Sequence, residues 1–213
     1  MFVGLLVILA YAGHFTANGP EPTDLLFHWS LAIITVVGDA IFVIAMLLIS
    51  RGLPRREVFA LRRPRSWPEA IRLGLAAIVA SYVVSAALVS QFGLGAREQA
   101  MPIYWDGARL APYLANLIVL ATVVPIAEET TCRGLGFWLL EPYGAPVAVV
   151  GSALAFALLH GAVVDFPWVL TLGLGAGILR WRSGSLYPSL LLHGTINAIA
   201  VFAAGVAGAT GAT

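Results

Sequence analysis

Long apolar stretches constrain the fold of this chain more than any other feature of its sequence. A helix that crosses a bilayer needs about 20 consecutive, mostly apolar residues. Because such a helix satisfies its own backbone hydrogen bonds, it is the form that an apolar stretch takes in lipid. We therefore expect an all-α, polytopic transmembrane helix bundle of about seven spans and no strands. The candidate spans lie near residues 2–18, 25–50, 70–93, 111–141, 146–163, 165–181 and 186–208.

The composition agrees with a membrane protein. Of the 213 residues, 60% are hydrophobic and 11% are charged, whereas soluble domains have about 25% charged residues. The net charge of +1 argues against a nucleic-acid partner. The first apolar stretch lacks a basic n-region, so we expect a retained helix and not a signal peptide. We interpret residues 1–213 as a single membrane domain, with N-terminal helices and a basic loop in 1–95 and a motif-bearing core in 111–208.

The connector after the second span sets the predicted orientation. Short arginine-rich loops stay in the cytoplasm, so we expect residues 51–70 to be cytoplasmic in a multi-pass protein of the cell membrane. An amphipathic segment that binds anionic lipid headgroups is the alternative for this connector. Counting spans from it places the turn that contains Arg180 and Arg182 on the same side. The arginines of the connector are Arg51, Arg55, Arg56, Arg62, Arg63, Arg65 and Arg72.

Two adjacent carboxylates and an arginine interrupt the fourth predicted span, in VVPIAEETTCRGLG. A charged side chain in the hydrocarbon region costs about 3 kcal/mol and commonly marks a functional site. Glu129 and Arg133 are four residues apart, so they meet on one helix face and form a structural ion pair. Glu128 lies about 100° around the helix from Glu129. It therefore points away from the arginine and is left free for chemistry.

Two further polar groups lie at a similar depth in later spans. Phe156 precedes His160 by one helical turn, and we assign Phe156 to structural support. Ser189, His193 and Asn197 form a stripe along the last span. A lone histidine in an apolar helix is often only a packing residue, and a polar stripe often only forms hydrogen bonds between helices. At a rise of 1.5 Å per residue, however, the groups come to within about 6 Å of one level, which helix tilt can absorb. They can therefore converge on one buried polar chamber.

The three motifs, in this order on successive helices, resemble the CPBP family, which comprises CAAX-type prenyl endopeptidases and bacteriocin self-immunity proteins. Here they read EETTCR (128–133), FALLH (156–160) and HGTIN (193–197). The resemblance covers roughly residues 111–208. It implies an intramembrane endopeptidase that hydrolyses a peptide bond with an activated water. We prefer a metal-free mechanism that requires no cofactor, with zinc as the alternative.

The resemblance also implies a role for each motif residue. Glu128 and His160 would activate the water, and His193 and Asn197 would stabilise the oxyanion of the tetrahedral intermediate. A carboxylate in a low-dielectric chamber is a competent general base, and preorganised oxyanion donors contribute about 3 kcal/mol or more. We expect His160 to be the imidazole nearest to Glu128.

Several alternatives use the same or neighbouring residues. Glu128, His160 and His193 form a His₂Glu set that suits zinc with an open position for water, and a chelator would separate the two mechanisms. Aspartyl proteases need two membrane aspartates, and only Asp39 lies deep in a span; we expect it to be a buried hydrogen-bonding residue. No nucleophile motif surrounds the serines near residue 185.

The alternative from another class is a non-catalytic membrane scaffold or immunity protein that binds a partner in the same chamber. A transporter fits less well, because the chain shows no inverted repeat. The presence of every candidate catalytic group favours the enzyme.

Substrate choice is the part of the function that the sequence constrains least. Family members usually have bulky apolar residues where this chain has Thr130, Thr131 and Cys132, which alters the packing around Glu128. A hydrophobic or lipidated peptide, or the terminal segment of a membrane protein, is the substrate class that we expect, with membrane lipid as the surrounding partner.

Overall fold

The computed structural model describes residues 22–93 and 97–211, and these ranges contain helices and no strand. The predicted all-α membrane bundle is therefore confirmed, while the predicted span at 2–18 lies outside the described residues. The main helices are α2 (Trp29–Ile49), α3 (Arg55–Val58), α4 (Trp67–Phe92), α5 (Leu110–Ile118), α6 (Val124–Glu129), α7 (Phe137–Leu140), α8 (Ala145–Leu159), α9 (Phe166–Ser183) and α10 (Tyr187–Thr210).

Each predicted span from residue 25 onward coincides with a helical segment. Within the described residues, four segments are long and apolar enough to cross a membrane: α2, α4, the continuous run Gly107–Tyr143 and α10. Helix α8 is apolar but only 15 residues long, and α9 carries two arginines in its last turn. The structure thus supports a membrane bundle with four candidate crossings among the described residues.

The run Gly107–Tyr143 contains the predicted fourth span, which is too long for one simple crossing. It includes α5, α6 and α7 and is interrupted by two π-helical segments, η4 (Val119–Val123) and η5 (Thr130–Gly136). A π-helical turn changes the register of the backbone hydrogen bonds and often occurs at functional sites. Glu128 and Glu129 end the short α-helical piece between these two segments.

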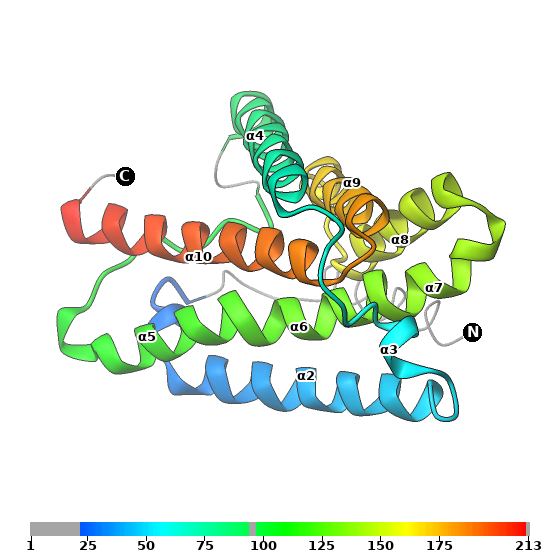
Figure 1. Ribbon diagram of the computed structural model, residues 1–213. Helices are drawn as coiled ribbons and strands as arrows, with labels where there is room; N and C mark the ends of the chain where they lie inside the picture. Colours follow the sequence, from blue (N-terminus) through cyan, green and yellow to red (C-terminus); the bar gives the residue numbers. More distant parts are fainter. Residues whose placement is uncertain (1–21, 94–96, 212–213) are drawn as a thin grey trace.

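Figure 1 shows how the helices are arranged. Helix α2, the run from α5 to α7, and α10 lie roughly side by side, whereas α4 and α9 cross them steeply. Helices α8 and α9 pack closely because Gly173 and Gly177 face the α8 backbone: a Cβ on Gly173 would lie 3.2 Å from the Ala153 Cα, and one on Gly177 would lie 3.2 Å from the Val149 oxygen. Small residues of this kind let membrane helices approach each other.

The basic connector and the α9–α10 turn meet at one end of the molecule. Arg62 Nε donates to the Gly184 oxygen at 2.7 Å, and the Arg65 backbone N–H donates to the Ser183 oxygen at 2.9 Å. Gly184 ends α9 with a left-handed φ of 67°, a conformation that favours glycine. The two segments that we predicted to share one side of the membrane are therefore in contact.

Candidate active site

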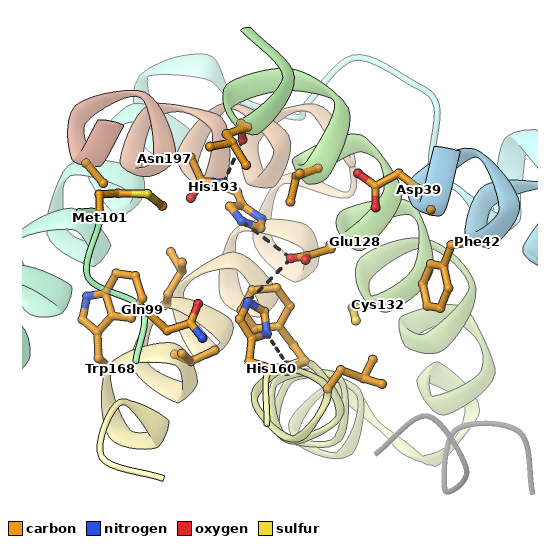
Figure 2. Close-up of a pocket in the computed structure, with 18 residues that line it drawn as sticks. Asp39, Phe42, Gln99, Met101, Glu128, Cys132, His160, Trp168, His193 and Asn197 are labelled. Atoms are coloured by element: carbon orange, nitrogen blue, oxygen red, sulfur yellow. Dashed lines mark hydrogen bonds and ion pairs between the residues drawn. The ribbon is translucent and has the colours of Figure 1, made fainter. Parts of the chain in front are cut away.

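The four predicted catalytic side chains line one cavity of about 490 Å³. Glu128 comes from α6, His160 from the residue that follows α8, and His193 and Asn197 from α10. Figure 2 shows Glu128 at the centre, with His193 on one side of it and His160 on the other. The structure thus brings together residues that are up to 69 positions apart in the sequence, from Glu128 to Asn197.

The Glu128 carboxylate faces both imidazoles. Its Oε2 atom lies 3.8 Å from His160 Nε2 and 3.7 Å from His193 Nε2. These distances exceed those of direct hydrogen bonds and are in the range where a water bridges polar groups. Oε2 is buried and has no hydrogen-bond partner among the described residues. The two imidazoles are about equally near, so, contrary to our expectation, the structure does not single out His160 as the nearest imidazole.

Backbone geometry fixes how the His160 ring is presented. Helix α8 ends here because Gly161 adopts a left-handed φ of 64°, which leaves the last carbonyl groups of the helix without intrahelical donors. His160 Nδ1 lies 2.9 Å from the Phe156 carbonyl oxygen. Because a carbonyl oxygen only accepts, Nδ1 carries the proton, and the unprotonated Nε2 faces Glu128.

Glu129 has a second role that its pairing with Arg133 did not reveal. Arg133 Nη1 donates to Glu129 Oε1 at 3.0 Å, and the two side chains are fully buried. The same oxygen lies 3.1 Å from His193 Nδ1. A carboxylate that accepts the Nδ1 proton orients the ring and directs Nε2 into the cavity, as second-shell carboxylates do elsewhere. Glu129 therefore positions His193 as well as pairing with Arg133.

Phe156 lies between the buried arginine and both histidines. The Arg133 guanidinium stacks over the Phe156 ring at 4.3 Å from its centroid, a cation–π distance. The ring centroid lies 4.5 Å from that of His160 and 5.5 Å from that of His193. One aromatic side chain thus contacts the buried arginine and both imidazoles, and its supporting role stays a prediction.

Asn197 is held by the first π-helical segment. Its Nδ2 donates to the Leu120 backbone oxygen at 2.9 Å, and the amide group has a second N–H to offer. This contact needs a close approach of α10, and Gly194 provides it: a Cβ at this position would lie 2.6 Å from the Ala121 oxygen. The glycine next to His193 thus sets the distance between α10 and the helix that carries Glu128.

The three residues that depart from the family pattern have distinct surroundings. Thr130 and Thr131 turn their hydroxyls back to carbonyls of the preceding turn, at 2.6 Å from the Ile126 oxygen and 2.8 Å from the Ala127 oxygen. They therefore satisfy backbone groups at the start of η5. Cys132 is buried and lines the cavity one turn after Glu128. A small side chain here leaves room beside the carboxylate that a bulky one would fill.

A polar strap that the sequence analysis missed covers one side of the cavity; we define it as residues 97–99. The Glu98 carboxylate accepts the backbone N–H groups of Val163, Val164 and Asp165 at 2.9–3.1 Å. Burial of Glu98 opposes its charge, but these donors outweigh that effect, so the pKa of Glu98 is lowered. The strap therefore ties down the loop that directly follows His160.

Asp165 joins the strap from the other side. Arg97 Nε donates to its Oδ1, and the Gln99 backbone N–H donates to its Oδ2 at 2.7 Å. Gln99 itself lines the cavity. This charged cluster joins two loops, with Arg97 and Glu98 far from Asp165 in sequence. It therefore gives no periodic signal that the sequence analysis could use.

One other expectation was wrong. Asp39 lines the cavity, and its buried Oδ2 has no hydrogen-bond partner among the described residues, so it is not the hydrogen-bonded core residue that we expected. Arg180, in the last turn of α9, is 2% exposed. It donates to the Arg133 carbonyl oxygen at 3.0 Å and stacks on Phe137 at 4.8 Å from the ring centroid.

The metal alternative can be compared with the side-chain positions. In residues 22–93 and 97–211, no group of three or more His, Cys, Asp or Glu side chains is arranged so that it could hold a metal ion. Zinc ligands must lie about 2.0–2.2 Å from a common centre. Glu128, His160 and His193 are not among such groups, and the zinc mechanism stays a prediction for chelation to test.

Comparison with known proteins identifies the core of the chain. Residues 110–199 match the family model described as "Rce1-like: Type II CAAX prenyl endopeptidase Rce1-like". This region is therefore similar to the Rce1-like family. The matched segment runs from α5 into α10 and includes Glu128, His160, His193 and Asn197. No curated protein and no solved structure matches the chain. The Rce1-like region supports a membrane peptidase with a peptide or protein substrate.

Proposed function

We propose that this protein is an intramembrane endopeptidase that hydrolyses a peptide bond of a hydrophobic or lipidated substrate with a water activated by Glu128 and His160. The observation that carries the proposal is the position of Glu128 Oε2. This atom is buried, has no hydrogen-bond partner among the described residues, and lies within 3.8 Å of both imidazole Nε2 atoms. It is therefore a free acceptor aimed at the place where a water would meet both rings.

In the proposed first step, Glu128 takes a proton from the water while the bare His160 Nε2 orients it. The water oxygen then bonds to the carbonyl carbon of the substrate, and the carbonyl oxygen becomes an oxyanion. Glu128 afterwards delivers the proton to the leaving nitrogen as the C–N bond breaks. The products are a carboxylic acid and an amine, so one water is consumed for each bond.

His193 and Asn197 are the proposed oxyanion donors. Glu129 accepts at His193 Nδ1, and donation from Nε2 as well requires the ring to be protonated on both nitrogens. Asn197 uses one N–H for the Leu120 oxygen and offers the second to the oxyanion. Donors held in place before the reaction need no reorganisation during it, which is the source of their catalytic effect.

The apolar lining of the cavity supports a membrane-embedded substrate. Besides the polar groups, its walls include Phe42, Leu120, Leu172, Trp168 and Met101. Cavities of about this size with a few convergent polar groups are typical of small binding sites. A hydrophobic peptide segment, with or without a lipid group, matches these walls.

Proteolysis of a hydrophobic peptide library in detergent tests the proposal. Glu128→Gln keeps the shape of the side chain but removes the basic oxygen, so we expect loss of turnover with near-normal folding and peptide binding. Asn197→Ala should reduce kcat about 100-fold or more, because it removes one of two oxyanion donors. Full turnover by Glu128→Gln would contradict the mechanism. Retained binding with no turnover in the unaltered protein would favour a scaffold or immunity role.

Chelation separates the metal-free mechanism from the zinc alternative. We expect purified protein to keep its activity after prolonged treatment with a strong chelator and removal of free metal. Loss of activity that returns on adding zinc would instead assign Glu128, His160 and His193 as ligands. Metal analysis of the same sample provides the control for incomplete removal.

A further inference from the structure

Asp39 is a charged residue at a costly position that the proposed mechanism does not use. It is the one Asp, Glu, Lys or Arg in α2, a span with a mean hydropathy of 2.7. A charged side chain in such a span is costly and commonly serves a function. Its Oδ2 is buried without a hydrogen-bond partner among the described residues, and the side chain lines the cavity that contains Glu128.

No ion pair joins Asp39 to a cationic side chain in residues 22–93 and 97–211. The arginines outside the basic connector are engaged elsewhere: Arg97 with Asp165, Arg109 with Asp24 and Asp106, Arg133 with Glu129, Arg182 with Glu69, and Arg180 with the Arg133 carbonyl. The chain has no lysine, and residues 1–21 contain no arginine. No arginine lines the cavity, whereas both Asp39 and Glu128 do.

Asp39 also lies in a separate part of the cavity. Figure 2 shows Asp39 and Phe42 on one side of Glu128, and Gln99, Met101 and Trp168 on the other. Asp39 and Phe42 are three residues apart, so they share a face of α2. This side of the cavity therefore combines an apolar ring with an unpaired carboxylate.

We propose that Asp39 is a specificity-determining residue that selects substrates with a basic side chain, lysine or arginine, close to the cleaved bond; this inference rests on the proposed function. A lysine or arginine side chain has an apolar stem and a cationic end. The stem matches the wall formed with Phe42, and the cation pairs with the Asp39 carboxylate. An ion pair that is shielded from water is stronger than one at a surface, so substrate binding offsets the cost of the unpaired charge.

The test uses matched peptides. A hydrophobic peptide that the protein cleaves is made with lysine, or with its uncharged isostere norleucine, at each position that flanks the cleaved bond. At one position, we expect kcat/KM to favour lysine by about 30-fold or more, the lower end of what truncating a buried charge pair costs. Equal kcat/KM for both peptides at every position overturns the inference without any variant.

Substitutions then assign the preference to Asp39. Asp39→Asn should lower kcat/KM for the lysine peptide to about that for the norleucine peptide, whereas Asp39→Glu should keep the preference for lysine. Glu69→Gln is the matched control, because it neutralises a carboxylate that pairs with Arg182 outside the cavity. A lysine preference that persists in Asp39→Asn, or an equal loss on both peptides, assigns Asp39 another role.

Binding measurements separate this inference from the proposed function. Affinity for the lysine and norleucine peptides is measured in Glu128→Gln and in Glu128→Gln with Asp39→Asn, neither of which needs turnover. A preference that disappears with Asp39→Asn supports the inference even if the unaltered protein cleaves nothing, in which case only the proposed function fails. Cleavage without any preference for lysine supports the proposed function and overturns the inference about Asp39.

Discussion

At the residue scale, Arg133 connects more of the candidate site than any other side chain described above. It pairs with Glu129, donates through Nη2 to the Gly173 oxygen of α9 at 2.8 Å, and stacks on Phe156. A fully buried guanidinium is stable only with partners of this kind. The residue therefore holds α9, Glu129 and the aromatic ring that contacts both histidines, although it does not itself line the cavity.

Arg133→Ala should lower both stability and activity. The substitution leaves Glu129 as a buried carboxylate without its guanidinium partner, a change that costs about 3–5 kcal/mol, and it releases the orientation of His193. Thermal unfolding in detergent measures the first effect and peptide hydrolysis the second. Arg182→Ala is the control, because the exposed Arg182–Glu69 pair should contribute about 1 kcal/mol or less. Unchanged melting with lost activity would make Arg133 catalytic.

At the element scale, the approach of α10 to η4 decides whether the site forms. His193 and Asn197 belong to α10, while Glu129 and the Leu120 oxygen belong to the helix that η4 interrupts. Gly194 allows a close approach, since a Cβ there would lie 2.6 Å from the Ala121 backbone oxygen. Backbone atoms cannot move aside as a flexible side chain does. The close approach of these two elements therefore depends on the absence of a side chain at Gly194.

Gly194→Ala should push α10 away from η4. Although it adds only one methyl group, it should therefore lower activity strongly. We expect a loss of about 1–3 kcal/mol of stability, typical of overpacking, with a large fall in peptide hydrolysis as His193 leaves Glu129. Gly74→Ala in α4 is the matched control: a Cβ there meets nothing within 4 Å, so helix propensity should make it neutral or slightly stabilising. Equal effects of both variants would contradict the argument.

The strap provides an element whose stability depends on pH. Because the pKa of Glu98 is lowered from its ordinary value of 4.5, its contribution is complete above that value and is lost as the pH falls through the folded-state pKa. We expect Glu98→Gln to melt below the unaltered protein at neutral pH and the difference to shrink below pH 4.5. Glu57→Gln, at an exposed side chain in the connector, is the control. A difference that grows on acidification would contradict the assignment.

At the scale of the whole molecule, positive charge is concentrated at one end. The arginines of the connector between α2 and α4 lie at the end where that connector contacts the α9–α10 turn, whereas Arg97 and Arg109 are each paired with aspartate. Arginine in short loops favours the cytoplasmic side. We therefore propose that residues 51–70 face the cytoplasm.

Labelling of introduced cysteines tests this orientation. Arg55→Cys should react with a membrane-impermeant thiol reagent only when the cytoplasmic face is accessible. Ala100→Cys, in the exposed segment that follows the far end of α4, should react only from the opposite face. The natural Cys132 is buried, so labelling of the unaltered protein measures the background reaction. Labelling of Arg55→Cys from outside intact cells would reverse the topology.

The sequence by itself determined the properties that depend on neighbours along the chain. Apolar length predicted the helices, because only helices satisfy the backbone in lipid. The i, i+4 spacing of Glu129 and Arg133 predicted their ion pair, and the same geometry turned Glu128 away from it. Comparable depth along separate spans indicated that Glu128, His160 and His193 lie at one level, and the structure places them around one cavity.

Only the tertiary structure decided how the helices are rotated and how closely they approach. It placed Glu129 against His193, turned Asp39 into the cavity and buried Arg180. In a soluble helix, the polar stripe indicates which face is outward, but lipid is as apolar as a protein interior, so hydropathy leaves the facing sides of membrane helices unspecified. That choice depends on close contacts between distant residues, such as Gly194 against Ala121, which no local pattern in the sequence encodes.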